Sequence, residues 1–343
     1  MTLTSSLLIT AWPLSWGLMN FIAPDYFFNP KDGVLSFASF VKKGSAHDAR
    51  IDSINRIECM AFGVQLLTMS LMQIFVTNDS TTKKALLHLK FFMHVLILSL
   101  CIYTATGNGM VVDEDSMLDP KITYFWIGTH FTICLTLVTD MIRYGAKSKR
   151  PTLYIRDPAT FSHLTLIVIQ LLYLGTFVAI KLFYPGTLGP NGVLPFFFTP
   201  VSPDYDNTAH GFDEFGLFLS HLEGIYFAAY CLSLLELLMN DRTVERIRWQ
   251  NQYYALSTTL YTVLFLRGAF EESTILNRPM FAAFGILDFI GGIGSILWLG
   301  PGLFKLSVPT KTKVPVPGKH VVEPTLVDEK EAANRASTSK KID

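Results

Sequence analysis

The sequence predicts an all-α fold, a polytopic membrane helical bundle of about eight transmembrane helices. Half of the 343 residues are apolar and only 16% are charged, whereas an average soluble domain has roughly 25% charged residues. The apolar residues, which include 27 Phe, form long runs instead of being scattered along the chain. A helix needs about 20 such residues to cross the hydrocarbon layer, and several runs reach this length.

Eight segments match the length and composition of a membrane-crossing helix. They are Leu7–Phe28, Glu58–Val76, Ala85–Ala105, Ile122–Ile142, Ser162–Tyr184, Phe215–Met239, Tyr253–Phe270 and Met280–Phe304. Pro13, Asn20 and Pro24 interrupt the first segment, which could instead lie in the membrane interface. We expect the eight segments to form one integral membrane domain over residues 1–306.

Basic residues predict how the helices are oriented. Lys and Arg gather in every second loop and after the last segment, and the loops between them carry acidic clusters such as Asp113–Asp115. The positive-inside rule then places the basic loops and the carboxyl terminus in the cytosol. The loop at residues 29–57 conflicts with this topology, because it is basic and falls on the opposite side.

The last 37 or so residues, 307–343, are rich in Pro, Lys, Glu and Ser, which predicts a disordered cytosolic tail. The tail ends in Lys340-Lys341-Ile342-Asp343. Lysines at these two positions form a dilysine retrieval signal, an address that receptors read in the cytosol. We therefore expect residence in the endoplasmic reticulum membrane, with chance occurrence in a lysine-rich tail as the alternative.

Composition and motifs exclude several classes of function. The formal net charge is zero, so nothing predicts a nucleic-acid partner. The four cysteines lie in apolar runs, where we expect small buried side chains and neither a metal site nor a disulfide framework. The sequence has no DDxxD-like cluster for magnesium and a diphosphate, no phosphate-binding glycine loop, no GxSxG and no HExxH. We expect no metal and no cofactor.

A faint internal repeat relates the two halves of the chain. "RIECMAFGVQLL" resembles "HLEGIYFAAYCL", and "GTHF" falls opposite "ILDF". The alignment pairs Glu58 with Glu223, Phe62 with Phe227, and His130 with Asp288. We predict two four-helix repeats in parallel orientation, residues 1–145 and 160–306.

Two carboxyl groups lie deep inside predicted helices. Ionisable side chains within a membrane are costly, and they usually face a cavity or a partner. Glu223 and Asp288 each lie about nine residues from the same end of their segments, which places both roughly 14 Å deep. Two carboxyls at one depth could share a cavity. In the alternative interpretation hydroxyl groups or Arg267 satisfy them, and they are structural. His94 and His130 also lie within segments, where we expect hydrogen bonds inside the bundle.

Aromatic residues follow the two acids at helical spacing. Tyr226, Phe227 and Tyr230 lie three, four and seven residues after Glu223, which predicts one helix face. Asp288 has Phe281 and Phe284 before it and two glycines after it, Gly291 and Gly292, which would allow close helix packing. These sets predict an acid pair among aromatic rings, unless the rings are ordinary packing.

This combination suits one kind of chemistry. Aromatic faces stabilise cations, and a carboxyl in an apolar site can stay protonated at neutral pH. An acid that protonates an olefin or epoxide, beside rings that shelter a carbocation and exclude water, is what polyene cyclisation needs. We therefore predict Glu223, Asp288 and Arg267 as catalytic residues, and the five aromatic residues as substrate-binding.

Arg267 has two interpretations. It lies four residues before Glu271, and such a pair readily forms an ion pair within one helix. Alternatively, Arg267 favours the ionised form of one of the two buried carboxyls, so that the pair divides into an acid and a base.

The chain resembles the fungal membrane-bound terpene cyclases of meroterpenoid biosynthesis, the group that includes the ascofuranone and macrophorin cyclases. The resemblance covers the eight segments, the high Phe and Tyr content, the intramembrane acids and the tail signal. It implies an isomerase-type enzyme that cyclises the farnesyl chain of a prenylated aromatic or quinone-like substrate by metal-free protonation. No short motif of that family fixes its catalytic residues in this sequence.

Two other classes of function fit the same residues. A sterol or lipid isomerase, or a lipid-binding protein of the endoplasmic reticulum membrane, could also use an acid-and-aromatic cavity. A small-molecule transporter is the third class, because duplicated bundles with charges near the membrane midplane are typical of transporters.

Overall fold

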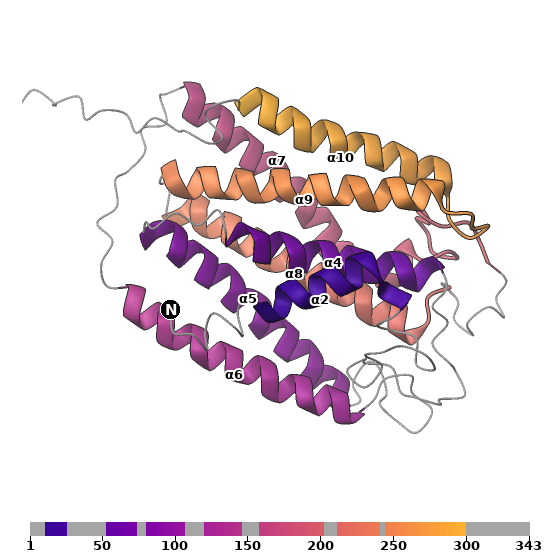
Figure 1. The fold of residues 1–343 in the computed structure, drawn as a ribbon, viewed down its shortest axis with the longest axis horizontal. Coiled ribbons are helices and arrows are strands. Elements are labelled where there is room, and N and C mark those ends of the chain that lie inside the picture. Colours follow the sequence, from indigo (N-terminus) through magenta and orange to yellow (C-terminus); the bar gives the residue numbers. More distant parts are fainter. Residues whose placement is uncertain are drawn as a thin grey trace, which may run out of the picture. The chain divides into compact units, whose positions relative to one another are not determined.

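A computed structural model shows a bundle of α-helices that run side by side (Figure 1). It describes residues 11–25, 53–73, 80–106, 120–145, 158–201, 211–240 and 244–299. The helices in these residues are α2 (Trp12–Ile22), α4 (Ser53–Met72), α5 (Ser80–Ala105), α6 (Pro120–Gly145), α7 (Pro158–Phe183), the short 3-10 helix η3 (Pro185–Leu188), α8 (Glu214–Asn240), α9 (Val244–Phe270) and α10 (Arg278–Leu299).

Seven of the predicted segments correspond to the seven longest of these helices. Of the first predicted segment, Leu7–Phe28, the structure describes residues 11–25, and the rest of the segment lies outside the described residues. Within residues 11–25, the helix α2 has 11 residues and is about 17 Å long. Pro13 lies in the first turn of α2, consistent with the interruptions in the sequence. The tail and Lys340-Lys341 lie outside the described residues.

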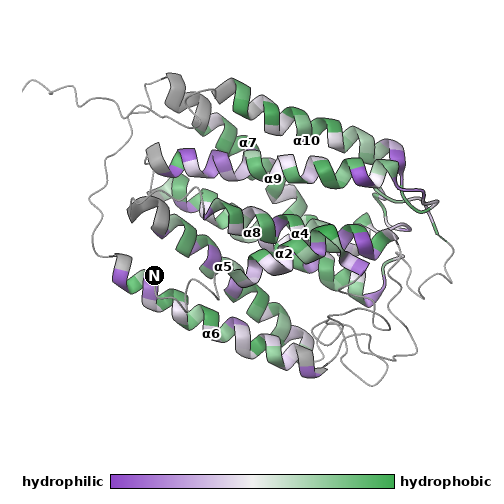
Figure 2. Ribbon diagram, viewed as in Figure 1, coloured by the Kyte–Doolittle hydropathy of each residue, from purple (hydrophilic) through white to green (hydrophobic). Residues whose placement is uncertain are grey.

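Four of the described helices, α5, α6, α7 and α8, are long and apolar enough to cross a membrane. Several helices also carry large apolar side chains on their outer surface, and Figure 2 shows apolar residues along most of the bundle. Leu172 of α7, Ile142 of α6 and Leu287 of α10 are each at least 60% exposed. Long apolar helices with exposed apolar faces indicate a helical membrane protein. The count of eight crossing helices stays a prediction.

Polar side chains are concentrated in the middle of the bundle. Arg246, Gln250 and Asn251 of α9 are completely buried, and Gln65 of α4 is 1% exposed. These residues explain why the seventh predicted segment began only at Tyr253, whereas α9 begins at Val244. A helix surrounded by other helices tolerates polar residues that a lipid-facing helix does not, because neighbouring side chains provide hydrogen bonds.

The helices pack in a regular order around the central contact between α4 and α8. The helix pairs α2–α4, α5–α6, α7–α8 and α9–α10 are in contact, and α5 contacts α8 as α9 contacts α4. Glycine allows the close approach of α9 and α10, because a Cβ atom at Gly292 would lie 2.9 Å from Oγ1 of Thr258. The predicted close packing at this glycine is therefore confirmed.

The two connections that follow α7 and α9 meet at one end of the bundle. Phe198 forms an isolated antiparallel bridge with Leu276, and Asn277 donates a backbone hydrogen bond to the carbonyl of Phe197 at 2.9 Å. Both phenylalanines point to the cavity described below, so these connections form one of its walls. The four cysteines are buried and unbridged, as the sequence predicted.

Candidate active site

A cavity between α4, α7, α8, α9 and α10 holds both predicted acids. It encloses about 920 Å³ of empty space, a figure that includes the open space at its mouth. Its lining includes three carboxylate side chains, Glu58, Glu223 and Asp288. We call it the acid cavity. Glu223 and Asp288 are 4% and 8% exposed, so both face the protein interior, not the outer surface.

A buried lysine joins two of the three carboxylates. Nζ of Lys181, in the last turn of α7, lies 2.5 Å from Oε2 of Glu223 and 3.3 Å from Oε2 of Glu58. The same ammonium lies 3.4 Å from Oγ of Ser220. Lys181 and Glu58 are both 6% exposed. A charged group is tolerated at such depth only when it is paired, and here one lysine is shared by two glutamates from different helices.

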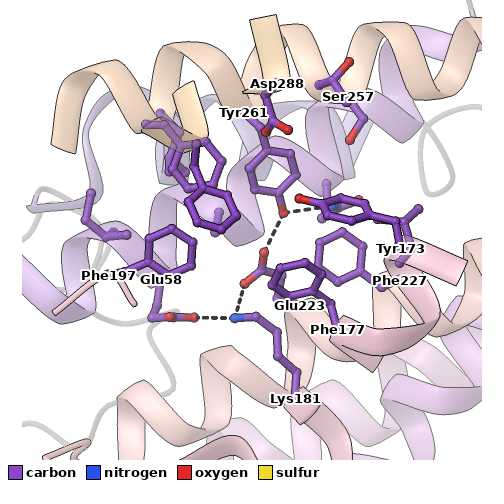
Figure 3. Close-up of a pocket in the computed structure, with 18 of the residues that line it drawn as sticks. Glu58, Tyr173, Phe177, Lys181, Phe197, Glu223, Phe227, Ser257, Tyr261 and Asp288 are labelled. Atoms are coloured by element: carbon purple, nitrogen blue, oxygen red, sulfur yellow. Dashed lines mark hydrogen bonds and ion pairs between the residues drawn. The ribbon is translucent and has the colours of Figure 1, made fainter. Parts of the chain in front are cut away.

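Glu223 has a second partner on the opposite side of its carboxylate. The hydroxyl of Tyr261 donates to Oε1 of Glu223 at 2.6 Å and accepts from Nε2 of Gln65 at 2.8 Å. The chain of contacts therefore begins at Gln65 and continues through Tyr261. Figure 3 shows its further course from Tyr261 through Glu223 to Lys181 and Glu58. Both oxygens of Glu223 are engaged, which makes this side chain a fixed part of the wall.

Asp288 has a different environment. It lies in the middle of α10 and lines the same cavity, and within the described part of the chain it makes no hydrogen bond or ion pair. Three tyrosines, Tyr173, Tyr254 and Tyr261, lie within range of its charge. Of the three acids in this cavity, Asp288 is the one with both carboxyl oxygens available to a bound molecule.

Aromatic rings form most of the remaining wall. The lining contains Tyr173, Phe177, Phe197, Phe198, Phe227, Tyr230, Tyr253, Tyr254, Tyr261, Phe265, Phe281 and Phe284. The rings contact one another. Phe197 stacks on Phe265 with centroids 5.4 Å apart and meets the edge of Phe284 at 4.8 Å. Phe227 stacks on Tyr261 at 6.1 Å. A cation formed here would meet ring faces on several sides.

Four of the five predicted aromatic residues line the acid cavity: Phe227, Tyr230, Phe281 and Phe284. The placement of Tyr226 beside Glu223 was wrong. Tyr226 lines a second cavity on the other side of α8 and meets Phe62 edge to face at 5.6 Å. Neighbouring residues on a helix point about 100° apart, so Tyr226 and Phe227 face opposite flanks although both lie one turn from Glu223.

The prediction that Arg267 joins the acids was also wrong. Arg267 is exposed, does not line the acid cavity and makes no ion pair among the described residues. It lies six residues after Tyr261 and so about 120° away around α9, on a different face of the helix. The simpler prediction of an Arg267–Glu271 pair fails too, because Oε1 of Glu271 accepts from Nη1 of Arg56 at 2.6 Å.

Neither Lys181 nor Glu58 was among the site residues predicted from the sequence. Lys181 is a lysine near the end of a predicted crossing helix, a position that is usually explained by contact with lipid headgroups. Glu58 was expected at the entrance of its segment. The available signal was the internal alignment, which paired Glu58 with Glu223, and the structure places both on one ammonium group.

Searches against protein-family models, curated proteins and solved structures find no match to this chain. The resemblance to meroterpenoid cyclases therefore depends on the residues of the chain itself. No group of three or more His, Cys, Asp or Glu side chains comes together as a metal site within the described ranges.

Proposed function

We propose that the chain is an integral membrane terpene cyclase that cyclises the prenyl chain of a meroterpenoid precursor by protonation. The observation that carries this proposal is an acid, Asp288, at the wall of a cavity lined by aromatic rings, where none of the residues that the structure describes forms a hydrogen bond with it. A farnesyl chain is long, apolar and flexible, and it suits a cavity whose wall is formed largely by aromatic rings.

In the proposed reaction Asp288, in its acid form, donates its proton to the terminal olefin or epoxide of the chain. The electron pairs of the neighbouring double bonds then form the new carbon–carbon bonds, and the positive charge moves along the chain past the ring faces. The last cation loses a proton from a neighbouring carbon to solvent at the cavity opening, and Asp288 takes a proton from solvent before the next turnover, so substrate and product are isomers. The rings also keep water from the cation, which would otherwise be trapped as an alcohol.

The lysine network is proposed to position the cavity wall, not to supply the first proton. Because Glu223 is engaged by Lys181 and Tyr261, it holds the Tyr261 ring at the cavity edge. A phenol that donates its proton to a carboxylate has an electron-rich ring, and such a ring is a good face for a passing cation. Glu223 therefore acts through Tyr261 in this proposal.

The membrane arrangement and the location are part of the proposal. All eight predicted segments belong to the membrane domain, with α2 as a short helix held against α4, and the tail with Lys340-Lys341 lies in the cytosol. The helix contacts support two related halves. Exchanging α2, α4, α5 and α6 for α7, α8, α9 and α10 converts the contacts α2–α4, α5–α6 and α5–α8 into α7–α8, α9–α10 and α9–α4.

Feeding experiments test the activity. Microsomes that contain the protein receive a farnesylated phenol, or the same compound with a terminal epoxide, and products are separated and weighed by mass spectrometry. We expect a cyclised product with the mass of its substrate from at least one of the two compounds. Confirmed expression with no cyclised product from either would contradict the proposal.

The same microsomes separate the cyclase from the other classes. A sterol or lipid isomerase would shift a double bond in a sterol and leave the farnesyl chain open. A transporter would accumulate the compound in sealed vesicles without chemical change. Neither result is expected.

A further inference from the structure

A second cavity lies on the opposite side of the central α4–α8 pair. It is bounded by α2, α4, α5, α6 and α8 and contains about 480 Å³ of empty space. Phe62 and Tyr226 line this second cavity, whereas their neighbours in sequence, Ala61 and Phe227, line the acid cavity. The helices α4 and α8 therefore separate the two cavities at these residues. Among the residues that the structure describes, its lining has no Asp, Glu, Lys or Arg, in contrast to the acid cavity. We call it the histidine cavity.

Two buried histidines contribute ring nitrogens to this cavity, beside the indole N–H groups of its tryptophans and the hydroxyl of Tyr226. Nδ1 of His94 on α5 and Nδ1 of His130 on α6 lie 2.8 Å apart, which confirms the expected hydrogen bond within the bundle. His94 is 3% exposed and its Nε2 has no hydrogen-bond partner in the described residues. The ring of His130 stacks on Trp126 at 5.5 Å and has no further hydrogen bond there.

The hydrogen bond between the two rings fixes what their outer nitrogens can do. In a neutral pair one Nδ1 donates and the other accepts. The ring that donates at Nδ1 accepts at Nε2, and the other ring donates at Nε2. When both rings change tautomer, which takes two proton transfers, one at the shared Nδ1 atoms and one at the Nε2 atoms, these roles are reversed and both rings stay neutral. The pair can therefore bind either a hydroxyl or a carbonyl group, while a buried Nε2 without a partner costs stability.

Flat aromatic side chains surround the histidines. Trp16 meets Trp126 edge to face at 4.9 Å, and Trp12 lies 5.7 Å from Trp16. Wide indole faces favour flat, apolar ligands, and the absence of charged lining residues disfavours anions and cations. The predicted repeat also pairs His130 with Asp288, so each half would contribute one polar residue at a corresponding place.

We propose that the histidine cavity is a second small-molecule site, which binds a neutral ring compound of the phenol or quinone class through a hydroxyl or carbonyl group bonded to the His94–His130 pair. This site is distinct from the proposed cyclase cavity, and it does not depend on cyclase activity. Its ligand is recognised by one hydrogen bond and by ring contacts, whereas the acid cavity would take the longer prenyl chain.

Photolabelling of the full chain in detergent tests this site. The probe is a phenol that carries a trifluoromethyl-diazirine, and its comparison compound is the toluene analogue, which has the same shape without the hydroxyl. After irradiation, labelled peptides are identified by mass spectrometry. Peptides of α2, α5 and α6 report the histidine cavity, since none of these helices lines the acid cavity, and peptides of α7 and α10 report the acid cavity.

We expect the phenol to label α2, α5 and α6 at least about fivefold more than the toluene analogue, because only the phenol makes the hydrogen bond. His94→Leu and His130→Phe should remove this preference. Equal labelling by the two probes, or an unchanged preference in both variants, would overturn the proposal. If the variants do not fold, excess unlabelled hydroquinone must suppress phenol labelling of the wild-type helices, and a lack of suppression overturns the proposal equally.

Discussion

The two cavities on either side of α4 and α8 differ in their polar groups although the helices around them correspond. The acid cavity has a lysine bound to two glutamates and a third acid that makes no hydrogen bond or ion pair with the described residues. The histidine cavity has a hydrogen-bonded histidine pair, and no charged side chain from the described ranges lines it. Under the two proposals, similar aromatic walls have different tasks, because proton-donating chemistry needs an available acid and recognition of a neutral ligand does not.

Replacing the available acid should have the largest effect. Asp288→Asn keeps the size of the side chain and removes its proton, so we expect cyclisation to slow by at least about 100-fold, the lower range for a general acid. The rate of product formation in microsomes that contain equal amounts of the wild-type and variant proteins measures this effect.

Arg267→Gln is the matched control for Asp288→Asn. Its side chain is exposed and outside the acid cavity, so turnover should stay within about twofold of wild type, a range typical of surface substitutions. Wild-type turnover in Asp288→Asn would remove Asp288 from the mechanism.

Removing the buried cation should have the next largest effect, on stability. Lys181→Met keeps much of the side-chain volume but leaves Glu58 and Glu223 without their shared partner. Breaking a buried ion pair typically costs about 3–5 kcal/mol. We expect a marked fall in the melting temperature in detergent. The double variant Glu58→Gln with Lys181→Met should regain part of the loss, and no difference between the single and double variants would contradict shared pairing.

Tyr261→Phe should have an intermediate effect on stability. It removes the donor to Glu223 and the acceptor for Gln65 while the ring stays in place. Hydrogen bonds to charged groups contribute about 1.5–3 kcal/mol, so thermal unfolding should begin at a lower temperature than in wild type but above that of Lys181→Met. An unchanged melting temperature would show that the Gln65–Tyr261–Glu223 chain contributes little.

Removing one aromatic face should give the smallest effect and would sharpen the contrast between catalytic and lipid-facing rings. Phe265→Leu removes a ring that contacts Phe197, Phe281 and Phe284 in the acid cavity. A cation–π contact contributes about 0.5–2 kcal/mol, so we expect a loss of turnover of roughly 2–30-fold and more hydroxylated, early-quenched products. Phe131→Leu, on the exposed face of α6, should change neither. Equal product patterns in the two variants would contradict a role for ring faces.

Much of the fold follows from helical length and composition. The seven longer helices were predictable because lipid-length apolar runs leave few alternatives. The start of α9 was less predictable, since its first half is polar and is buried by neighbouring helices that a single segment does not reveal. Its end at Phe270 was predicted correctly. The limits of the first segment were also not predictable, because whether a proline-interrupted run crosses the membrane depends on its packing partner, here α4.

The candidate site was predicted in part. Depth along the helices indicated that Glu223 and Asp288 could meet one cavity, and helical spacing placed four of the five aromatic residues correctly. Spacing alone could not decide which flank of α8 faces the cavity, so Tyr226 was misplaced. Spacing also could not show that Lys181 approaches the two glutamates. Lys181 lies on another helix, α7, and its distance from Glu58 and Glu223 along the chain gives no register between them.

Cyclisation in heavy water tests the central claim most directly. If an acid of the protein protonates the terminal olefin of a farnesylated phenol, the cyclised product made in D₂O should carry one carbon-bound deuterium, and Asp288→Asn should make almost none of it. A cyclised product without carbon-bound deuterium, or labelled product formed by Asp288→Asn at the wild-type rate, would contradict protonation by Asp288 in the acid cavity.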